Sequence, residues 1–134
     1  AVIDVDNFKH INDNHGHDIG DIVLQSIVQT VLSCVRKTDA VIRYGGDEFV
    51  IIFFNIPQDI FGKKLERIRH SVDSLIIDDH PELHMSVSIG GAYGIGTIKK
   101  LFKAADNMMY QSKKAKNQVT IYYFDRNEDN TDNI

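Results

Sequence analysis

The sequence predicts an α/β or α+β fold in which helices pack on a sheet within one domain. Runs rich in Val, Ile and Phe, typical of strands, are mixed with apolar stripes of helical spacing. The two kinds of segment do not alternate strictly, and the chain holds no internal repeat. Its 134 residues, 43% of them hydrophobic and 25% charged, suit one globular domain with a sizeable core.

The first elements are predicted to be a strand, a polar loop and a helix. Residues 1–6 read as a short strand that ends in acids. Residues 7–20 are rich in Asn, Asp, His and Gly, the composition of an irregular, site-forming loop that could hold a helical turn. A helix is expected from Asp21, because apolar residues then recur at helical spacing. These residues are Leu24, Ile27, Val28, Val31, Leu32 and Val35.

A hairpin is expected next, where two β-rich runs flank Gly45-Gly46. A tight two-residue turn needs positive φ at both central positions, which glycine allows. The second run, residues 49–54, is apolar without alternation, which predicts burial on both faces. Asp47 and Glu48 follow the turn directly. Because an unpaired buried carboxylate is costly, these acids indicate a cation site or proton transfer, with a solvated hairpin tip as the alternative.

The second half is predicted to contain two helices and two strands. A helix could start at Asp59, and the alternating residues 85–89 read as a strand. The glycines within residues 90–96 indicate a bulge or turn. Thr97 suits the N-cap of a further helix, and residues 120–124 suit a last strand.

Composition limits the classes of function. A net charge of −4 does not indicate a nucleic-acid surface, and Cys34, the single cysteine, excludes an intrachain disulfide and is compatible with a reducing, cytoplasmic location. No apolar run approaches the roughly 18 residues of a membrane span, and the first residues do not read as a signal peptide. Residues 1–124 are expected to form the domain and residues 125–134 a loose polar tail. Because the chain opens directly on a strand, a fragment of a longer protein is expected.

Two acidic clusters lie at predicted strand ends, Asp4 with Asp6 and Asp47 with Glu48. If the strands are neighbours, the carboxylates surround a common point, and such hard oxygens suit Mg²⁺ together with substrate phosphates. Neighbouring strand residues point to opposite faces, so one acid of the second pair is expected to be a ligand and the other a supporting or proton-handling group. Asp4 and Asp6 share a face, and spacing does not choose between them.

A turn that could bind phosphate separates the two clusters. Asn7-Phe8-Lys9 follows a strand, and its backbone N–H groups with the lysine could cradle phosphate. The chain has no Walker-type glycine-lysine loop. A structural zinc site is disfavoured despite clustered histidines, because no second cysteine and no helical His-x-x-x-His occur.

Motifs spread along most of the chain carry a family resemblance. They are Asp4-Val5-Asp6-Asn7-Phe8-Lys9, Ile11-Asn12-Asp13, Gly16-His17-Asp18, Gly20-Asp21, Arg43-Tyr44-Gly45-Gly46-Asp47-Glu48-Phe49, Ser86-Val87-Ser88-Ile89-Gly90, and Ala105-Asp106 with Met109-Tyr110 and Lys113. In this order and at this spacing they resemble the GGDEF family of diguanylate cyclases, over residues 1 to about 119. The resemblance implies a palm-like nucleotidyl cyclase fold, a mainly antiparallel sheet of about five strands wrapped by helices.

The resemblance also implies roles for individual residues. Asp4, the Val5 carbonyl and Asp47 would hold Mg²⁺ or Mn²⁺, while Glu48 and Lys9 would join Asp47 in catalysis. Nucleotide-binding residues would be Asn7, Phe8, Lys9, Asn12, His17, Asp21, Lys113 and Lys116. Asn12 and Asp21 would read the guanine edge, where a carboxylate accepts from guanine donors but repels the acceptor edge of adenine. The lysines would meet the triphosphate.

The implied activity is condensation of two GTP into cyclic di-GMP with release of pyrophosphate. It would need a homodimer, and an upstream sensory or dimerising module is expected in the full-length protein. The alternative is a degenerate domain that acts as a GTP or cyclic di-GMP receptor or as a dimerisation module. Arg36 and Asp39 match the Arg-x-x-Asp inhibitory site of the family, with Arg67 as a second arm, although an ordinary helix end is the competing interpretation.

The sequence departs from the family pattern in two places. The family carries a helix and an Asp-x-Leu-Thr-Gly-Leu stretch before the first strand, and the 134 residues do not include them. Where the family reads Lys-x-x-Gly-Arg-Asn, the chain reads Lys113-Lys114-Ala115-Lys116-Asn117. Lys116 thus stands near the position of the arginine, and a lysine keeps the charge but loses the bidentate fork.

Overall fold

The computed structural model describes residues 1–125, so the predicted tail beyond Asp125 lies outside the described residues. Strands and helices follow one another along the chain without strict alternation. In order they are β1 (Val2–Val5), α1 (Phe8–His15), α2 (His17–Cys34), β2 (Ala40–Arg43), β3 (Glu48–Ile52), α3 (Gln58–Asp73), β4 (Val87–Tyr93), α4 (Ile98–Ala115) and β5 (Gln118–Tyr123).

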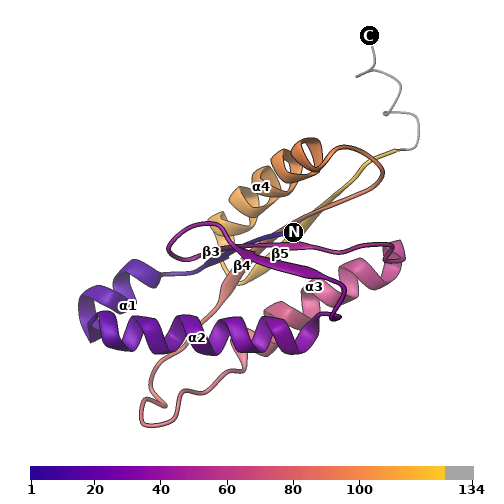
Figure 1. Cartoon of the computed structure of the whole chain (residues 1–134). Helices are drawn as coiled ribbons and strands as arrows, with labels where there is room; N and C mark the ends of the chain where they lie inside the picture. The colour runs from indigo at the N-terminus through magenta and orange to yellow at the C-terminus, as the bar shows by residue number, and fades with distance from the viewer. Residues whose placement is uncertain (126–134) are drawn as a thin grey trace.

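The strands form one sheet in the order β2-β3-β1-β4-β5. All neighbouring pairs are antiparallel except β4 with β5, which are parallel. Helices α2 and α3 cover one face of the sheet, and α4 covers the other (Figure 1). The predicted fold, a mainly antiparallel sheet wrapped by helices, is therefore confirmed.

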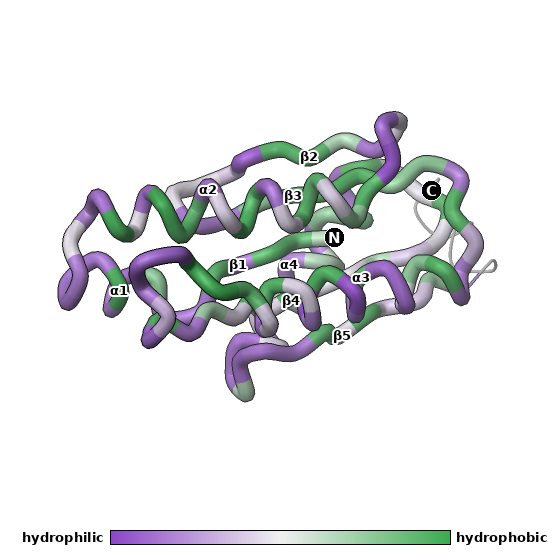
Figure 2. The backbone as a smooth tube through the Cα atoms, turned by 90° about the horizontal axis from the view of Figure 1, so that it is seen from below, coloured by the Kyte–Doolittle hydropathy of each residue, from purple (hydrophilic) through white to green (hydrophobic). Residues whose placement is uncertain are grey.

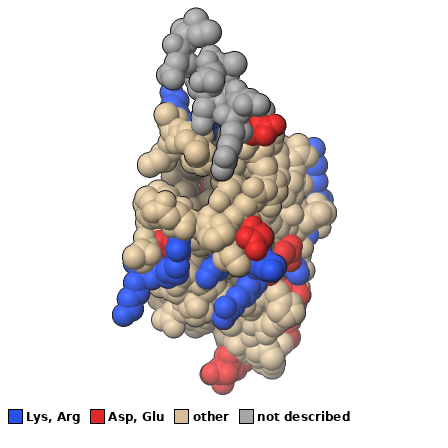
Figure 3. All heavy atoms as spheres, turned by 90° about the vertical axis from the view of Figure 1, so that its right-hand side faces the viewer, with Lys and Arg blue, Asp and Glu red and all other residues tan. Residues whose placement is uncertain are grey.

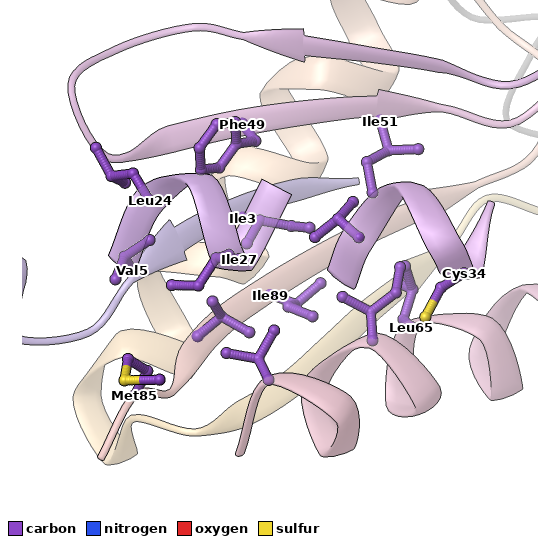
Figure 4. Packing of buried hydrophobic residues seen from close by; sticks show 14 of the residues in the cluster. Ile3, Val5, Leu24, Ile27, Cys34, Phe49, Ile51, Leu65, Met85 and Ile89 are labelled. Atoms are coloured by element: carbon purple, nitrogen blue, oxygen red, sulfur yellow. The ribbon is translucent and has the colours of Figure 1, made fainter. Parts of the chain in front are cut away.

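The larger core lies between the sheet and the pair α2 and α3. Hydrophobic and hydrophilic bands alternate along both helices (Figure 2), and the hydrophobic positions face the strands. Ile27 of α2 and Leu65 of α3 are fully buried in the same cluster as Ile3 of the central strand (Figure 4). Each such side chain stabilises the fold by about 1.5–3 kcal/mol through removal from water. Leu32, predicted to share the apolar stripe of α2, is instead 51% exposed.

The opposite face is packed so closely that β4 needs glycine. A Cβ atom on Gly90 would lie 2.0 Å from the backbone nitrogen of Met109, so α4 rests directly on the backbone of the strand. Val2 of β1 completes this smaller core with Ala105 and Met109. The sequence predicts a bulge or turn at Gly90 and Gly91, and this prediction is wrong because both residues lie within β4. The missing side chain of each leaves room for a helix that packs on the strand.

The polar segment 7–20 is mostly helical, which corrects the prediction of a loop and of a helix start at Asp21. Helix α1 forms because Ile11 is buried and Phe8 packs against the larger core. Gly16, with φ +88°, separates it from α2, which begins at His17. Packing against the core thus outweighs the loop-like composition of this segment.

The hairpin is present, but its turn differs from the predicted one. Arg43 pairs with Phe49, so the connection is longer than two residues. Among residues 1–125, only Gly16 and Gly94 are glycines with positive φ, so Gly45 and Gly46 do not adopt the predicted conformation. The Arg43 guanidinium instead holds the turn by donating to the Gly45 and Gly46 carbonyls at 3.1 and 2.7 Å.

Strand β3 is buried on one face only, contrary to the prediction. Phe49 and Ile51 are buried, whereas Val50 and Ile52 are half-buried. A groove of about 590 Å³ lies over these two residues on the α4 side, and Leu101 and Phe102 of that helix help to line it. Lys and Arg side chains lie beside Asp and Glu side chains on the face shown in Figure 3 rather than forming a continuous basic surface. None of the helices within residues 1–125 is long and apolar enough to span a membrane.

Candidate active site

Asp4 lies on the central strand, where it pairs across the sheet with Glu48 of β3 and Ser88 of β4. Its carboxylate is largely buried, and Oδ2 accepts a hydrogen bond from Lys113 Nζ at 2.8 Å. Burial raises the pKa of Asp4, and Lys113 opposes this while the nearby Asp47 charge adds to it. The other oxygen, Oδ1, is buried and has no hydrogen-bond partner among the described residues. Asp4 therefore keeps one oxygen available for a ligand.

The second acidic cluster meets the first at this end of the sheet. The Val5 N–H donates to the backbone carbonyl of Asp47 at 3.1 Å, which ties the hairpin turn to the end of β1. Burial raises the pKa of Glu48, and the charges of Asp106, Asp4 and Asp47 raise it further. Acids from β1, the hairpin and α4 thus repel one another around one point.

Asp6 differs from Asp4 although both follow the same strand. The Asp6 carboxylate is buried and accepts hydrogen bonds from Ser86 Oγ and Ser88 Oγ, both at 2.6 Å, and from the Asn117 N–H at 2.8 Å. These bonds fix the carboxylate between β1, β4 and the end of α4. Of the two acids that spacing could not separate, Asp4 is therefore the one with free ligand capacity.

The acidic site fits a divalent cation that is completed by its substrate. Within residues 1–125, no three His, Cys, Asp or Glu side chains stand close enough to form a metal site by themselves. Mg²⁺, however, usually binds one or two carboxylates and takes its other ligands from water and phosphates. The unpartnered Asp4 oxygen and the mutual repulsion of Asp4, Asp47 and Glu48 match that requirement.

Basic side chains border the acids on the α4 side. Lys113 is held by Asp4, and although burial opposes it, this bond raises the pKa of the Lys113 ammonium. Lys116 Nζ donates to Asn7 Oδ1 at 2.6 Å, which places it beside the predicted phosphate turn. Asn7 has φ 56° and precedes α1, where Lys9 is exposed in the first turn. Phe8, by contrast, packs against the core.

The predicted guanine-reading residues lie on α1 and in the first turns of α2. A Cβ on Gly20 would lie 1.8 Å from Asn12 Oδ1, so α1 and α2 approach closely there. That oxygen is buried and lacks a hydrogen-bond partner among the described residues. Asp21, the next residue, lines a hollow of about 420 Å³ between α2 and the hairpin, together with Arg43. His17 is exposed at the start of α2.

The predicted inhibitory motif forms a separate cluster at the other end of α2. The Arg36 guanidinium donates to Asp39 at 2.9 Å and to the Phe54 carbonyl at 2.6 Å. Although burial opposes the effect, the hydrogen bonds from Arg36 lower the pKa of Asp39. Arg67 is exposed on α3.

Sequence reasoning missed Asn117, Asp106 and Arg43 as parts of this region. Asn117 contacts Arg69 of α3 and Asp6, the residue after β1; both lie far from it in the chain, so no local pattern reveals it. Asp106 stands within one of the family motifs, and its charge raises the pKa of Glu48. The alternation of Ser86 and Ser88 on one strand face was an available signal for the anchoring of Asp6.

Comparison with known proteins gives consistent matches. The family model described as "Diguanylate cyclase, GGDEF domain" matches residues 1–118. The chain is 37% identical to "Diguanylate cyclase A" of Treponema denticola over 90% of this chain and 34% of that protein. It is 41% identical to "Diguanylate cyclase DgcM" of Escherichia coli over 84% of this chain and 27% of that protein. The chain thus spans about a third or less of the length of these curated relatives.

Solved structures share the fold. The GGDEF domain of DgcB from Caulobacter crescentus, solved in complex with c-di-GMP, is 31% identical with a TM-score of 0.82, over 90% of this chain and 74% of that chain. The active GGEEF domain of a diguanylate cyclase from Vibrio cholerae is 29% identical with a TM-score of 0.83, over 92% and 81%. The family match over most of the chain, together with these relatives, places the protein in the GGDEF domain family of diguanylate cyclases.

Proposed function

We propose that the domain is a diguanylate cyclase that condenses two GTP into cyclic di-GMP and releases pyrophosphate. In each step a 3′-hydroxyl attacks an α-phosphate. The observation that carries the proposal is the buried, unpartnered oxygen of Asp4 beside Asp47 and Glu48. Relatives named diguanylate cyclases at 37% and 41% identity support the same activity.

Asp4, the Val5 carbonyl and Asp47 are the residues that would hold Mg²⁺ or Mn²⁺. When bound, the metal would lower the pKa of the attacking hydroxyl and neutralise charge that develops on the phosphate. Burial and its acidic neighbours raise the pKa of Glu48, which makes its carboxylate a better proton acceptor than an ordinary exposed glutamate. Glu48 is therefore assigned to the reacting hydroxyl or to support of the metal ligands.

Lysines neutralise the triphosphate in this proposal. Lys9 is exposed in the first turn of α1, and Lys116 reaches Asn7 beside it. Lys113 pairs with Asp4 and must leave that carboxylate to contact a phosphate. Asn7 contributes with Lys9 to the phosphate-facing turn, and the packed ring of Phe8 fixes the position of that turn.

Guanine is read by Asn12 and Asp21, with His17 nearby. The Asn12 oxygen is buried without a partner, so a guanine N–H would satisfy it. The Asp21 carboxylate accepts from the donors of guanine, whereas adenine offers an acceptor at the same edge. The domain is therefore expected to prefer GTP over ATP.

The product requires two domains face to face, because each domain holds one GTP. A homodimer and an upstream sensory or dimerising module in a cytoplasmic protein follow as parts of the proposal. Product feedback inhibition is included, with Arg36, Asp39 and Arg67 as the cyclic di-GMP site. The exposed Arg36 guanidinium is suited to a phosphate or to the Hoogsteen edge of guanine. The DgcB domain from Caulobacter crescentus was solved with c-di-GMP bound.

Turnover separates the enzyme from a degenerate nucleotide receptor or dimerisation module. The chain is fused to a dimeric coiled coil and incubated with Mg²⁺ and GTP, and pyrophosphate release is measured. We expect release by the unsubstituted chain and by Asp59→Asn, which removes an exposed carboxylate away from the site. Asp47→Asn should abolish release without unfolding the domain. Binding of GTP without pyrophosphate release would instead identify a receptor, and an active Asp47→Asn variant would refute the metal role.

A further inference from the structure

Asn117 lies two residues after the end of α4, and its side chain is hydrogen-bonded to α3. Its Oδ1 accepts from Arg69 Nη1 at 3.0 Å, and its Nδ2 donates to Asp73 Oδ1 at 3.0 Å. The two partners stand one turn apart near the end of α3. The amide therefore uses both its oxygen and its nitrogen to attach the end of α4 to α3.

The backbone of Asn117 is attached to the acidic end of β1. Its N–H donates to Asp6 Oδ2 at 2.8 Å, and Asp6 is 2% exposed. A hydrogen bond to a buried carboxylate is charge-assisted and stronger than a neutral one. Asn117 thus connects α3, α4 and β1 at one point.

The turn around Asn117 adopts an unusual backbone conformation. Lys116 has φ 62° and Asn117 has φ 50°, so two consecutive residues other than glycine lie in the left-handed region. Asn tolerates this region better than most residues, but a lysine does not favour it. Such a turn persists only where surrounding contacts hold it, and here the bonds of Asn117 do so.

Two cations at the candidate active site lie in this turn or just before it. Lys116 Nζ reaches Asn7 Oδ1 at 2.6 Å, and Lys113 Nζ reaches Asp4 Oδ2 at 2.8 Å from the last turn of α4. We propose that Asn117 is a positioning residue that holds Lys113 and Lys116 for the β- and γ-phosphates of the bound nucleotide. This inference rests on the proposed function and assigns to Asn117 control over triphosphate affinity.

Binding of two nucleotides tests the proposal without turnover. Calorimetry in Mg²⁺ compares GMP with a GTP analogue that carries a methylene group between its α- and β-phosphates. For Asn117→Ala we expect about tenfold weaker binding of the analogue, the loss of about one strong hydrogen bond, and unchanged binding of GMP. A merely structural role would weaken both nucleotides equally, and that result, or an unchanged ratio, would overturn the proposal.

Three further variants keep the test decisive. Asp73→Ala removes one α3 partner of Asn117 without changing the turn. Like Asn117→Ala, it should lower the ratio of analogue affinity to GMP affinity. Asn117→Gly should behave as Asn117→Ala, because restored binding would assign the effect to backbone conformation rather than to the side chain. His84→Ala removes the other partner of Asp73 and should leave the ratio unchanged, so a change would contradict the proposal. Failure of the unsubstituted chain to bind either nucleotide would overturn the proposed function as well, whereas an unchanged ratio overturns this inference alone.

Discussion

Replacing Lys113 with methionine removes the only cation that the structure shows bonded to the Asp4 carboxylate within residues 1–125. The Asp4 side chain is 9% exposed and the Lys113 side chain 41% exposed, so the pair is intermediate between buried and surface. Breaking a buried pair costs about 3–5 kcal/mol, and exposed pairs contribute about 0–1 kcal/mol. We therefore expect Lys113→Met to lower the free energy of unfolding by about 1–3 kcal/mol.

Magnesium should reverse part of this loss. In the unsubstituted chain the Lys113 ammonium shares the Asp4 carboxylate with the metal and repels it, whereas in Lys113→Met the metal meets a carboxylate with no bonded cation. A ligand that binds only the folded state stabilises it more as its affinity rises. The gain in unfolding free energy on addition of Mg²⁺ is thus expected to be larger in the variant.

Urea unfolding followed by circular dichroism, with and without Mg²⁺, measures both effects. Lys114→Met is the matched control, because Lys114 is exposed on the same turn and its amine lies 3.5 Å from Gln111 Oε1 rather than near the acids. The control should change the free energy of unfolding by no more than about 0.5 kcal/mol. Equal unfolding free energies for the two variants, or equal stabilisation by Mg²⁺, would refute the role given to the Lys113–Asp4 pair.

Three further predictions concern packing, nucleotide affinity and pH. Gly90→Ala should destabilise the domain by about 3 kcal/mol or more, measured by urea unfolding, because the added Cβ meets the backbone of α4 at 2.0 Å. Gly20→Ala should displace the Asn12 amide, which lies 1.8 Å from the added Cβ, and weaken GTP binding in calorimetry more than it lowers stability. Burial opposes it, but Arg36 holds the pKa of Asp39 below its ordinary value of 3.8. The Arg36–Asp39 pair therefore stabilises the folded chain above pH 3.8, and this stabilisation is lost as the pH falls further and Asp39 becomes protonated. The stability difference between the unsubstituted chain and Asp39→Asn, followed by thermal unfolding, should therefore shrink below pH 3.8, and a constant difference would contradict it.

The parts of the fold that the sequence predicts well are those where local spacing carries the information. Leu65, Ile68 and Val72 recur at helical spacing, and all three are buried on α3. Thr97 caps α4 as predicted, because its Oγ1 accepts from the Lys100 N–H at 3.2 Å. Apolar periodicity and capping depend on neighbours a few residues away, so a single sequence suffices to find them.

Long-range packing decides the parts that the sequence predicts poorly. Residues 7–20 have the composition of a loop, yet contact of Phe8 and Ile11 with the core stabilises a helix there. Gly90 reads as a turn residue, yet its missing side chain makes room for α4. In both cases the deciding partner lies on another element, and spacing within the segment cannot reveal it.

The choice between Asp4 and Asp6 shows how the fold completes a site that the sequence only outlines. Alternation along a strand places both acids on one face, and nothing within the segment separates them. Ser86 and Ser88, about 80 residues away, donate to Asp6, and the Asn117 N–H adds a third bond. A carboxylate held by three donors has little freedom to bind another ligand, whereas one Asp4 oxygen is buried without a partner. The capacity to hold a cation therefore belongs to Asp4 because of what β4 and the end of α4 do to Asp6.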